Sequence, residues 1–184
     1  MHDPYVLPPN LPVPEDDGAA DHLVGLELPS LVLDSSQGPV DVSQFEVLYL
    51  YPRTGTPGVD PPPGWDEFPG ARGCTPQSCA FRDHAADLAG LGARVAGLSA
   101  QALDEQVEFA ARNHMPYPVI ADPELRLHAA LRMPLMEIAG FTLYKRLALI
   151  SEAGRIVKVL YPVFPPDRNA GDVVAWLRDR ATVG

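Results

Sequence analysis

The sequence is poor in cysteine, in positive charge and in long apolar runs. Only two cysteines occur in 184 residues, and 14 Lys and Arg stand against 24 Asp and Glu, for a net charge of −10. A chain this acidic is repelled by phosphate backbones and anionic lipid, so we expect no nucleic-acid partner. It has no stretch of the roughly 18 apolar residues that a membrane span needs. The N-terminus lacks a basic region followed by an apolar one, which argues against a secretory signal and favours a cytoplasmic protein.

The length and composition favour one domain preceded by a short arm. The chain is 46% hydrophobic, enough for a single substantial core. Residues 1–24 are rich in proline, and residues 4–14 alternate proline with apolar side chains. This pattern predicts an extended arm that either lies on the domain or moves freely. We expect the domain itself to cover residues 25–184.

The pattern along the domain predicts an α/β fold with a mixed sheet flanked by helices. Residues 31–44 indicate an N-terminal hairpin that turns at 35–38, and the apolar run "FEVLYLY" at 45–51 indicates a central strand buried on both faces. Residues 52–73 are too rich in proline and glycine for helix or strand. A helix capped by Thr75 follows over 75–91. The remaining prediction is strand 94–100, helix 103–115, an extended piece 116–122, helix 123–133, strands 143–150 and 155–161 joined by a turn, and helix 167–180.

The two cysteines, Cys74 and Cys79, lie at the start of the predicted helix 75–91. Unpaired amides and the helix dipole stabilise a thiolate at a helix N-terminus, which suits Cys74 to nucleophilic attack. In an unbroken helix the two Cα atoms would be roughly 8 to 9 Å apart. A disulfide tolerates at most about 7 Å. A bond between them therefore requires the first turns of the helix to unwind.

Other interpretations of the cysteines remain open. Both could be ordinary small helix residues. A zinc site would need a second pair of ligands, and His84, His114 and His128 do not have the spacing of such a pair. The two-residue spacing of a general disulfide reductase is also absent.

The motifs around the cysteines resemble the peroxiredoxins, specifically the Q-type or bacterioferritin-comigratory branch. That family has a strand ending in Tyr-Pro, three residues, Thr-Pro-Gly-Cys-Thr, and a second cysteine five positions on, followed by Phe-Arg-Asp. This chain has "YPRTGTPG" at 51–58 and "GCTPQSCAFRD" at 73–83, and the likeness continues over about residues 25–180. Residues 59–73 are an insertion between the two halves of the motif. The resemblance implies a thioredoxin-like fold.

The resemblance also implies roles for five residues. Cys74 would attack the peroxide and become a sulfenic acid, and Cys79 would resolve it as an intramolecular disulfide. Thr56 would hydrogen-bond the thiolate and the peroxide, Pro52 would shield the sulfur, and Arg146 would stabilise the thiolate and polarise the peroxide. Because of the insertion, Thr75 or Ser78 could supply the hydroxyl in place of Thr56.

The implied function is a thiol-dependent peroxidase. Its substrates would be hydrogen peroxide and organic hydroperoxides, and its reductant would be thioredoxin or a similar dithiol protein. We expect the protein to be a monomer or a weak dimer. No metal, haem or flavin would be needed. Two alternatives stay open: a peroxide-sensing redox switch, and a thioredoxin-fold interaction protein with little turnover. In the insertion, Trp65 and Phe68 could line a substrate mouth or a partner surface, or they could anchor the loop on the core.

Overall fold

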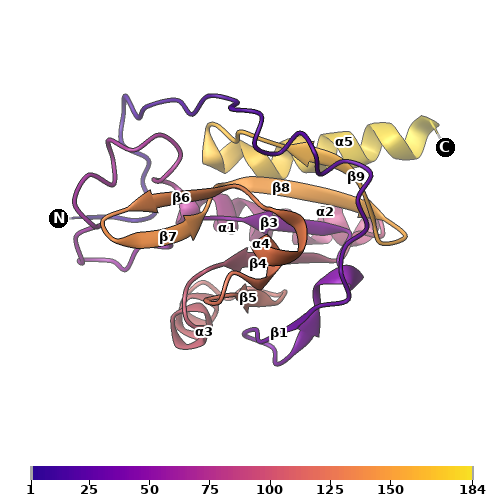
Figure 1. Cartoon of the computed structure of the whole chain (residues 1–184), viewed down its shortest axis with the longest axis horizontal. Helices are drawn as coiled ribbons and strands as arrows, with labels where there is room; N and C mark the ends of the chain where they lie inside the picture. Colours follow the sequence, from indigo (N-terminus) through magenta and orange to yellow (C-terminus); the bar gives the residue numbers. More distant parts are fainter. Residues whose placement is uncertain (1, 184) are drawn as a thin grey trace.

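A five-stranded mixed sheet forms the centre of the molecule in the computed structural model, which describes residues 2–183 (Figure 1). The strand order is β5-β4-β3-β8-β9. β3 pairs parallel with β4 and antiparallel with β8. The strands are β3 (Val47–Leu50), β4 (Val95–Ser99), β5 (Val119–Ala121), β8 (Leu147–Glu152) and β9 (Arg155–Leu160). The predicted thioredoxin-like α/β fold is confirmed.

The central strand β3 is buried on both faces, as its continuous apolar run predicts. Val47 and Tyr49 belong to the hydrophobic cluster on one side of the sheet, and Leu48 and Leu50 belong to the cluster on the other. This alternation follows from the period of two along a strand. Because β3 is the middle strand of the five, the loop that follows it leaves the sheet between β4 and β8.

Helices complete the core on both sides of the sheet. Side chains of α1 (Cys74–Asp83), α2 (Ala85–Gly90), α3 (Leu103–Arg112) and α5 (Asn169–Val183) pack in the cluster that contains Tyr49. Side chains of α4 (Arg126–Leu131) pack in the other cluster, as does the hairpin of β1 (Val32–Leu33) and β2 (Val40–Asp41). Short 3-10 turns, η1 (Val42–Gln44) and η2 (Pro166–Arg168), follow β2 and precede α5. The predicted N-terminal hairpin and last helix are confirmed.

The helix predicted over residues 75–91 differs from the structure in two respects. It begins at Cys74 with Gly73 as the N-cap, so the prediction that Thr75 caps it was wrong. Gly73 adopts φ +112°, a conformation that favours glycine and turns the chain into the helix. The helix is also divided at His84, whose backbone N–H bonds the carbonyls of both Ala80 and Arg82. Cys74 is consequently the first helical residue.

The predicted strand 143–150 is two strands in the structure, and that prediction was wrong. β7 (Phe141–Tyr144) pairs with β6 (Leu135–Ile138) in a hairpin, and β8 begins only at Leu147. The hairpin turns at Ala139 and Gly140, which both have positive φ, as this tight turn requires. Lys145 and Arg146 connect β7 to β8 and belong to neither strand. Arg146 is at the head of an apolar strand, as expected.

The N-terminal arm lies on the domain, which selects one of the two alternatives left open by its composition. It starts at the end of the molecule where the β6–β7 hairpin lies, runs along the molecule past β9 and reaches β1 (Figure 1). Asp17 accepts hydrogen bonds from Lys145 at 2.8 Å and from the Tyr161 hydroxyl at 2.7 Å. Ala20 and Leu23 are already part of the core. Among residues 2–183 no helix is long and apolar enough to cross a membrane.

Candidate active site

Cys74 is the first residue of α1 and is 2% exposed. Its sulfur accepts a hydrogen bond from the backbone N–H of Arg53 at 3.3 Å and one from Arg146 Nη2 at 3.3 Å. The thiol can donate to the Ala71 carbonyl at 3.7 Å. Two donors therefore point at one sulfur, one of them charged, and both can stabilise negative charge on it. The position at a helix N-terminus, predicted from the sequence, adds to the same effect.

The guanidinium of Arg146 lies beside this sulfur although the residue is only 3% exposed. Its Nη2 lies 3.1 to 3.3 Å from the carbonyl oxygens of Gly70, Ala71 and Arg72. Its Nη1 donates to the side-chain oxygen of Gln77. All of these protein partners are neutral, so none cancels the positive charge that faces the sulfur. A buried guanidinium needs such hydrogen bonds to offset its desolvation.

Gln77 is a site residue that the sequence interpretation missed. It lies one turn after Cys74 on α1, is fully buried, and donates through Nε2 to Asn169 Oδ1 at 3.0 Å. Asn169 begins α5, so the contact links both helices to Arg146. The three-residue spacing from Cys74 puts the glutamine near the same helix face. That spacing is the one sequence signal that could have indicated it.

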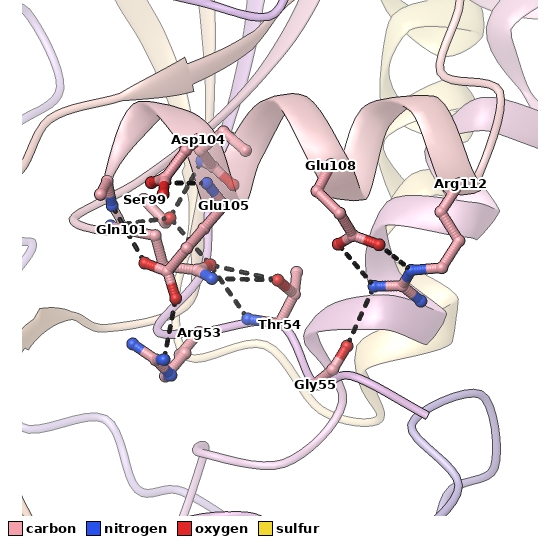
Figure 2. A network of polar contacts seen from close by, with 11 residues as sticks. Arg53, Thr54, Gly55, Ser99, Gln101, Asp104, Glu105, Glu108 and Arg112 are labelled. Carbon is pink, nitrogen blue, oxygen red and sulfur yellow. Dashed lines mark hydrogen bonds and ion pairs between the residues drawn. The ribbon is translucent and has the colours of Figure 1, made fainter. Parts of the chain in front are cut away.

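Gln101 fixes the loop after β3 through the contacts that Figure 2 shows. The same loop carries the Arg53 N–H that bonds the Cys74 sulfur. The side-chain oxygen of Gln101 accepts from the Thr54 N–H at 3.0 Å and from the Ser99 hydroxyl at 3.1 Å. Its Nε2 donates to the Thr54 hydroxyl at 3.1 Å. The amide thus ties the loop after β3 to the end of β4, next to the residue whose N–H reaches Cys74.

Helix α3 holds the same loop from its outer side (Figure 2). Arg53 Nη2 forms an ion pair with Glu105 at 2.8 Å, and its guanidinium lies over the ring of Phe141 in β7, 4.9 Å from the centroid. Further along α3, Arg112 donates to the Gly55 carbonyl at 3.2 Å and pairs with Glu108. The loop that the composition predicts is therefore an ordered wall of the site.

A cavity of about 440 Å³ opens beside Cys74, and we call it the Cys74 cavity. The insertion contributes Trp65, which is 5% exposed, and the β6–β7 hairpin contributes Phe141. Trp65 also packs with Met136 and Leu143 in a third hydrophobic cluster, with Phe68 partly buried against it. Two of the proposed roles of Trp65, lining the mouth and anchoring the loop, are therefore combined in one side chain.

Three residues are candidates for the hydroxyl that serves the site. Thr56 is exposed and lines the Cys74 cavity, and its side chain makes no hydrogen bond to the sulfur among residues 2–183. Thr75 lines the same cavity, and its buried hydroxyl has no partner within the described residues. The Ser78 hydroxyl is likewise buried without one. Pro52 is buried in the loop that precedes Arg53.

Cys79 is half-buried further along α1, and both cysteines are free thiols. Its sulfur lies 3.8 Å from Asn113 Oδ1. Burial raises the pKa of the Cys79 thiol, against the opposing charge of Arg82. Because residues 74–83 form one continuous helix, Cys79 cannot bond Cys74 in this conformation.

Gly73→Ala is expected to lower the free energy of unfolding by about 2–4 kcal/mol, because positive φ disfavours a side chain and overpacking adds to the cost. A Cβ at residue 73 would collide with Pro166 and lie 3.1 Å from a Leu7 methyl. Gly58 is a matched control, since it also has positive φ but has no heavy atom within 4 Å of its Cβ position. Urea denaturation of both variants measures the difference. Equal losses would show that the close approach at Gly73 is unimportant.

Comparisons with known proteins identify the family. The Redoxin family model matches residues 23–174. The chloroplastic peroxiredoxin Q of Sedum lineare is 26% identical over 176 residues, covering 92% of this chain and 86% of its own. A putative peroxiredoxin of Mycobacterium tuberculosis is 27% identical over 144 residues, covering 78% and 80%.

Solved structures show the same fold. The crystal structure of peroxidoxin BcpB from Mycobacterium tuberculosis aligns with a TM-score of 0.68 at 24% identity, covering 85% of this chain and 97% of that one. A PrxQ variant from Xylella fastidiosa aligns with a TM-score of 0.70 at 21% identity, covering 87% and 98%. Together with the family match and the cysteine pair, these findings confirm the resemblance seen in the sequence. The chain belongs to the redoxin family and is a Q-type peroxiredoxin, a thiol peroxidase with the thioredoxin fold.

Proposed function

We propose that this peroxiredoxin reduces hydrogen peroxide and organic hydroperoxides through the thiolate of Cys74. The sulfur attacks the terminal oxygen of the peroxide, the O–O bond breaks, and the other oxygen leaves as water or an alcohol after taking up a proton. Cys74 becomes a sulfenic acid. The Cys79 thiol then condenses with it, forming the disulfide and releasing water. The two thiols supply both electrons, so no metal, haem or flavin enters the balance.

The contacts of the Cys74 sulfur carry this proposal. The Arg53 N–H and Arg146 Nη2 both point at it, and the Cys74 cavity gives a peroxide access to it. In the proposed reaction the same guanidinium stabilises negative charge on the leaving oxygen. Pro52 limits the access of water to the thiolate. Thr56 provides a hydroxyl at the cavity wall for the peroxide.

The size of the Cys74 cavity supports organic hydroperoxides as substrates. About 440 Å³ is far more than hydrogen peroxide needs, and Trp65 and Phe141 give the cavity aromatic walls. A structure of the bacterioferritin comigratory protein from Xanthomonas campestris was described for its alkyl peroxide reduction activity. An alkyl or aryl group would lie against these rings while the peroxide oxygens reach the sulfur.

Resolution in this proposal requires the start of α1 to unwind. Cys79 is in a continuous helix with Cys74, and its raised pKa keeps the half-buried thiol protonated near neutral pH. Unwinding both brings the sulfurs within bonding distance and exposes Cys79 to water. The resulting disulfide would be reduced by thioredoxin or a similar dithiol protein. We infer a monomer or weak dimer, and a cytoplasmic location where such reductants are abundant.

The experiment that tests the proposed function is peroxide consumption with hydrogen peroxide and with cumene hydroperoxide. With thioredoxin, thioredoxin reductase and NADPH, we expect one NADPH to be oxidised per peroxide over many turnovers. Without reductant, consumption should stop at one equivalent per chain. Consumption of neither peroxide, or a single equivalent even with reductant, would contradict the proposal.

A further inference from the structure

The first residues of the N-terminal arm lie at the peroxidase site. His2 and Pro4 line the Cys74 cavity. The guanidinium of Arg72, two residues before Cys74, donates to the backbone carbonyls of Asp3 at 2.8 Å and Val6 at 3.0 Å. The Redoxin match begins only at residue 23, so the family module does not include these contacts. The arm therefore adds a layer over the residues that lead into α1.

Tyr5 connects the arm to the surroundings of Cys79. Its hydroxyl donates to Asn113 Oδ1 at 2.8 Å and accepts from Arg112 Nη1 at 3.0 Å. The same Asn113 oxygen lies 3.8 Å from the sulfur of Cys79. Asn113 is 2% exposed, and its Nδ2 is bonded to the carbonyl of Phe109. The arm and the Cys79 thiol thus share one fixed acceptor.

These contacts lie on both sides of the segment that has to move. Before the helix, Arg72 is held by the arm, and Gly73 is closely approached by Leu7. Beside the helix, Tyr5 is bonded to the acceptor of Cys79. Unwinding residues 74–79 displaces Gly73 and the Cys79 sulfur, so it disturbs contacts at both places. A contact of the arm that exists only while α1 is folded raises the free energy needed to unwind the helix.

We propose that the N-terminal arm, anchored by Tyr5, is a positioning element for the resolution step: it holds α1 folded while Cys74 meets peroxide, and it is released when Cys74 and Cys79 bond. The proposal rests on the assigned roles of the two cysteines. The arm slows disulfide formation and leaves the first step unchanged. It thereby sets how long the sulfenic acid persists, and with it the fraction that a second peroxide converts to sulfinic acid with release of water or an alcohol. By linkage, the disulfide loosens the arm to the same extent.

Tyr5→Phe tests this, since it keeps the ring and removes only the hydroxyl. In single-turnover experiments with hydrogen peroxide, we expect disulfide formation to be about three- to tenfold faster, the effect of losing one or two hydrogen bonds. The rate of Cys74 oxidation should not change, and less sulfinic acid should form at high peroxide. Val13→Ala, which alters an exposed side chain later in the arm, is the control and should match the wild type. An unchanged rate of disulfide formation in Tyr5→Phe would overturn the proposal.

Hydrogen exchange of the wild-type protein provides a second test, which does not depend on peroxide chemistry. The disulfide is formed with diamide, and amide exchange over residues 2–14 is compared with that of the reduced protein. We expect faster exchange in the disulfide form, at the Val6 amide among others, which bonds the Asp3 carbonyl in the reduced protein. Equal exchange in both forms would contradict release of the arm. Failure of wild-type Cys74 to react with peroxide would instead count against the proposed function.

Discussion

A Cys74→Ser variant is expected to lose peroxide consumption altogether, whereas Cys79→Ser should consume one equivalent and then stall. Serine at residue 74 gives a hydroxyl that is not ionised at neutral pH, so the two donors on residue 74 have no anion to stabilise. In Cys79→Ser the first step is intact, because Cys79 makes no contact with the Cys74 sulfur in the folded helix. Its sulfenic acid persists and becomes a target for a second peroxide.

Peroxide consumption in the presence of thioredoxin measures both effects. The wild type should turn over many times and Cys74→Ser should not turn over. Cys79→Ser should consume one equivalent rapidly and then only the further peroxide that slowly overoxidises its sulfenic acid. A small-molecule dithiol in place of thioredoxin should restore some turnover to Cys79→Ser, because it can attack the sulfenic acid directly. Equal multiple-turnover activity in the two variants would refute the assignment of roles.

Arg146→Gln is expected to lower the second-order rate constant of Cys74 oxidation about 100- to 1,000-fold, the effect of removing one preorganised donor from a developing charge. Arg146 Nη2 is the charged donor on the Cys74 sulfur, and glutamine is neutral and shorter. Alkylation of Cys74 by iodoacetamide at pH 7 should slow as well, because the attacking sulfur loses its charged donor. Arg146→Lys should recover only part of the rate, since an ammonium cannot contact the sulfur, Gln77 and the carbonyls together.

Arg155→Gln is the matched control for Arg146. Arg155 lies in β9, adjacent to β8, with an exposed side chain paired to Glu27. Its substitution should leave the rate unchanged, as expected for a surface ion pair. Circular dichroism confirms that each variant is folded. A rate in Arg146→Gln within threefold of the wild type would show that Arg146 only stabilises the fold.

The sequence predicts the centre of the fold well because strong local patterns determine it. The run at 45–51 has no polar position that could face water except Glu46, and it becomes the central strand β3. Residues 52–73 contain so many glycines and prolines that neither a helix nor a strand can form there, so the sequence predicts a loop. Cys74 is at a helix N-terminus and Arg146 precedes an apolar strand, as the motifs indicate.

The parts that were missed depend on contacts between distant segments. The β6–β7 hairpin turns through Ala139 and Gly140, and alanine carries no signal for positive φ. Gln77 and Gln101 are ordinary polar residues in the sequence, and they acquire roles only when Arg146 and Thr54 approach them in space. The position of the N-terminal arm could not be predicted either, because proline predicts an extended chain but not the surface on which that chain lies.

The path of the insertion shows how such contacts build the site. Successive turns bond Trp65 to Pro62, Phe68 to Trp65 and Ala71 to Phe68, so the chain returns to Gly73 without forming a helix or strand. Burial of Trp65 then fixes the loop against the β6–β7 hairpin. Lengthening a loop adds little to the entropic cost of closing it. The insertion therefore preserves the approach of Arg53 to Cys74 and adds a wall to the Cys74 cavity.

The most direct test of the central claim is the intact mass of the reduced protein before and after one equivalent of hydrogen peroxide. The account predicts that the wild type loses two hydrogen atoms and both free thiols. Cys79→Ser should gain one oxygen atom on Cys74, and Cys74→Ser should not change. A wild type that keeps its mass and both thiols over minutes would contradict the assignment of Cys74 and Cys79 as a peroxidatic and resolving pair.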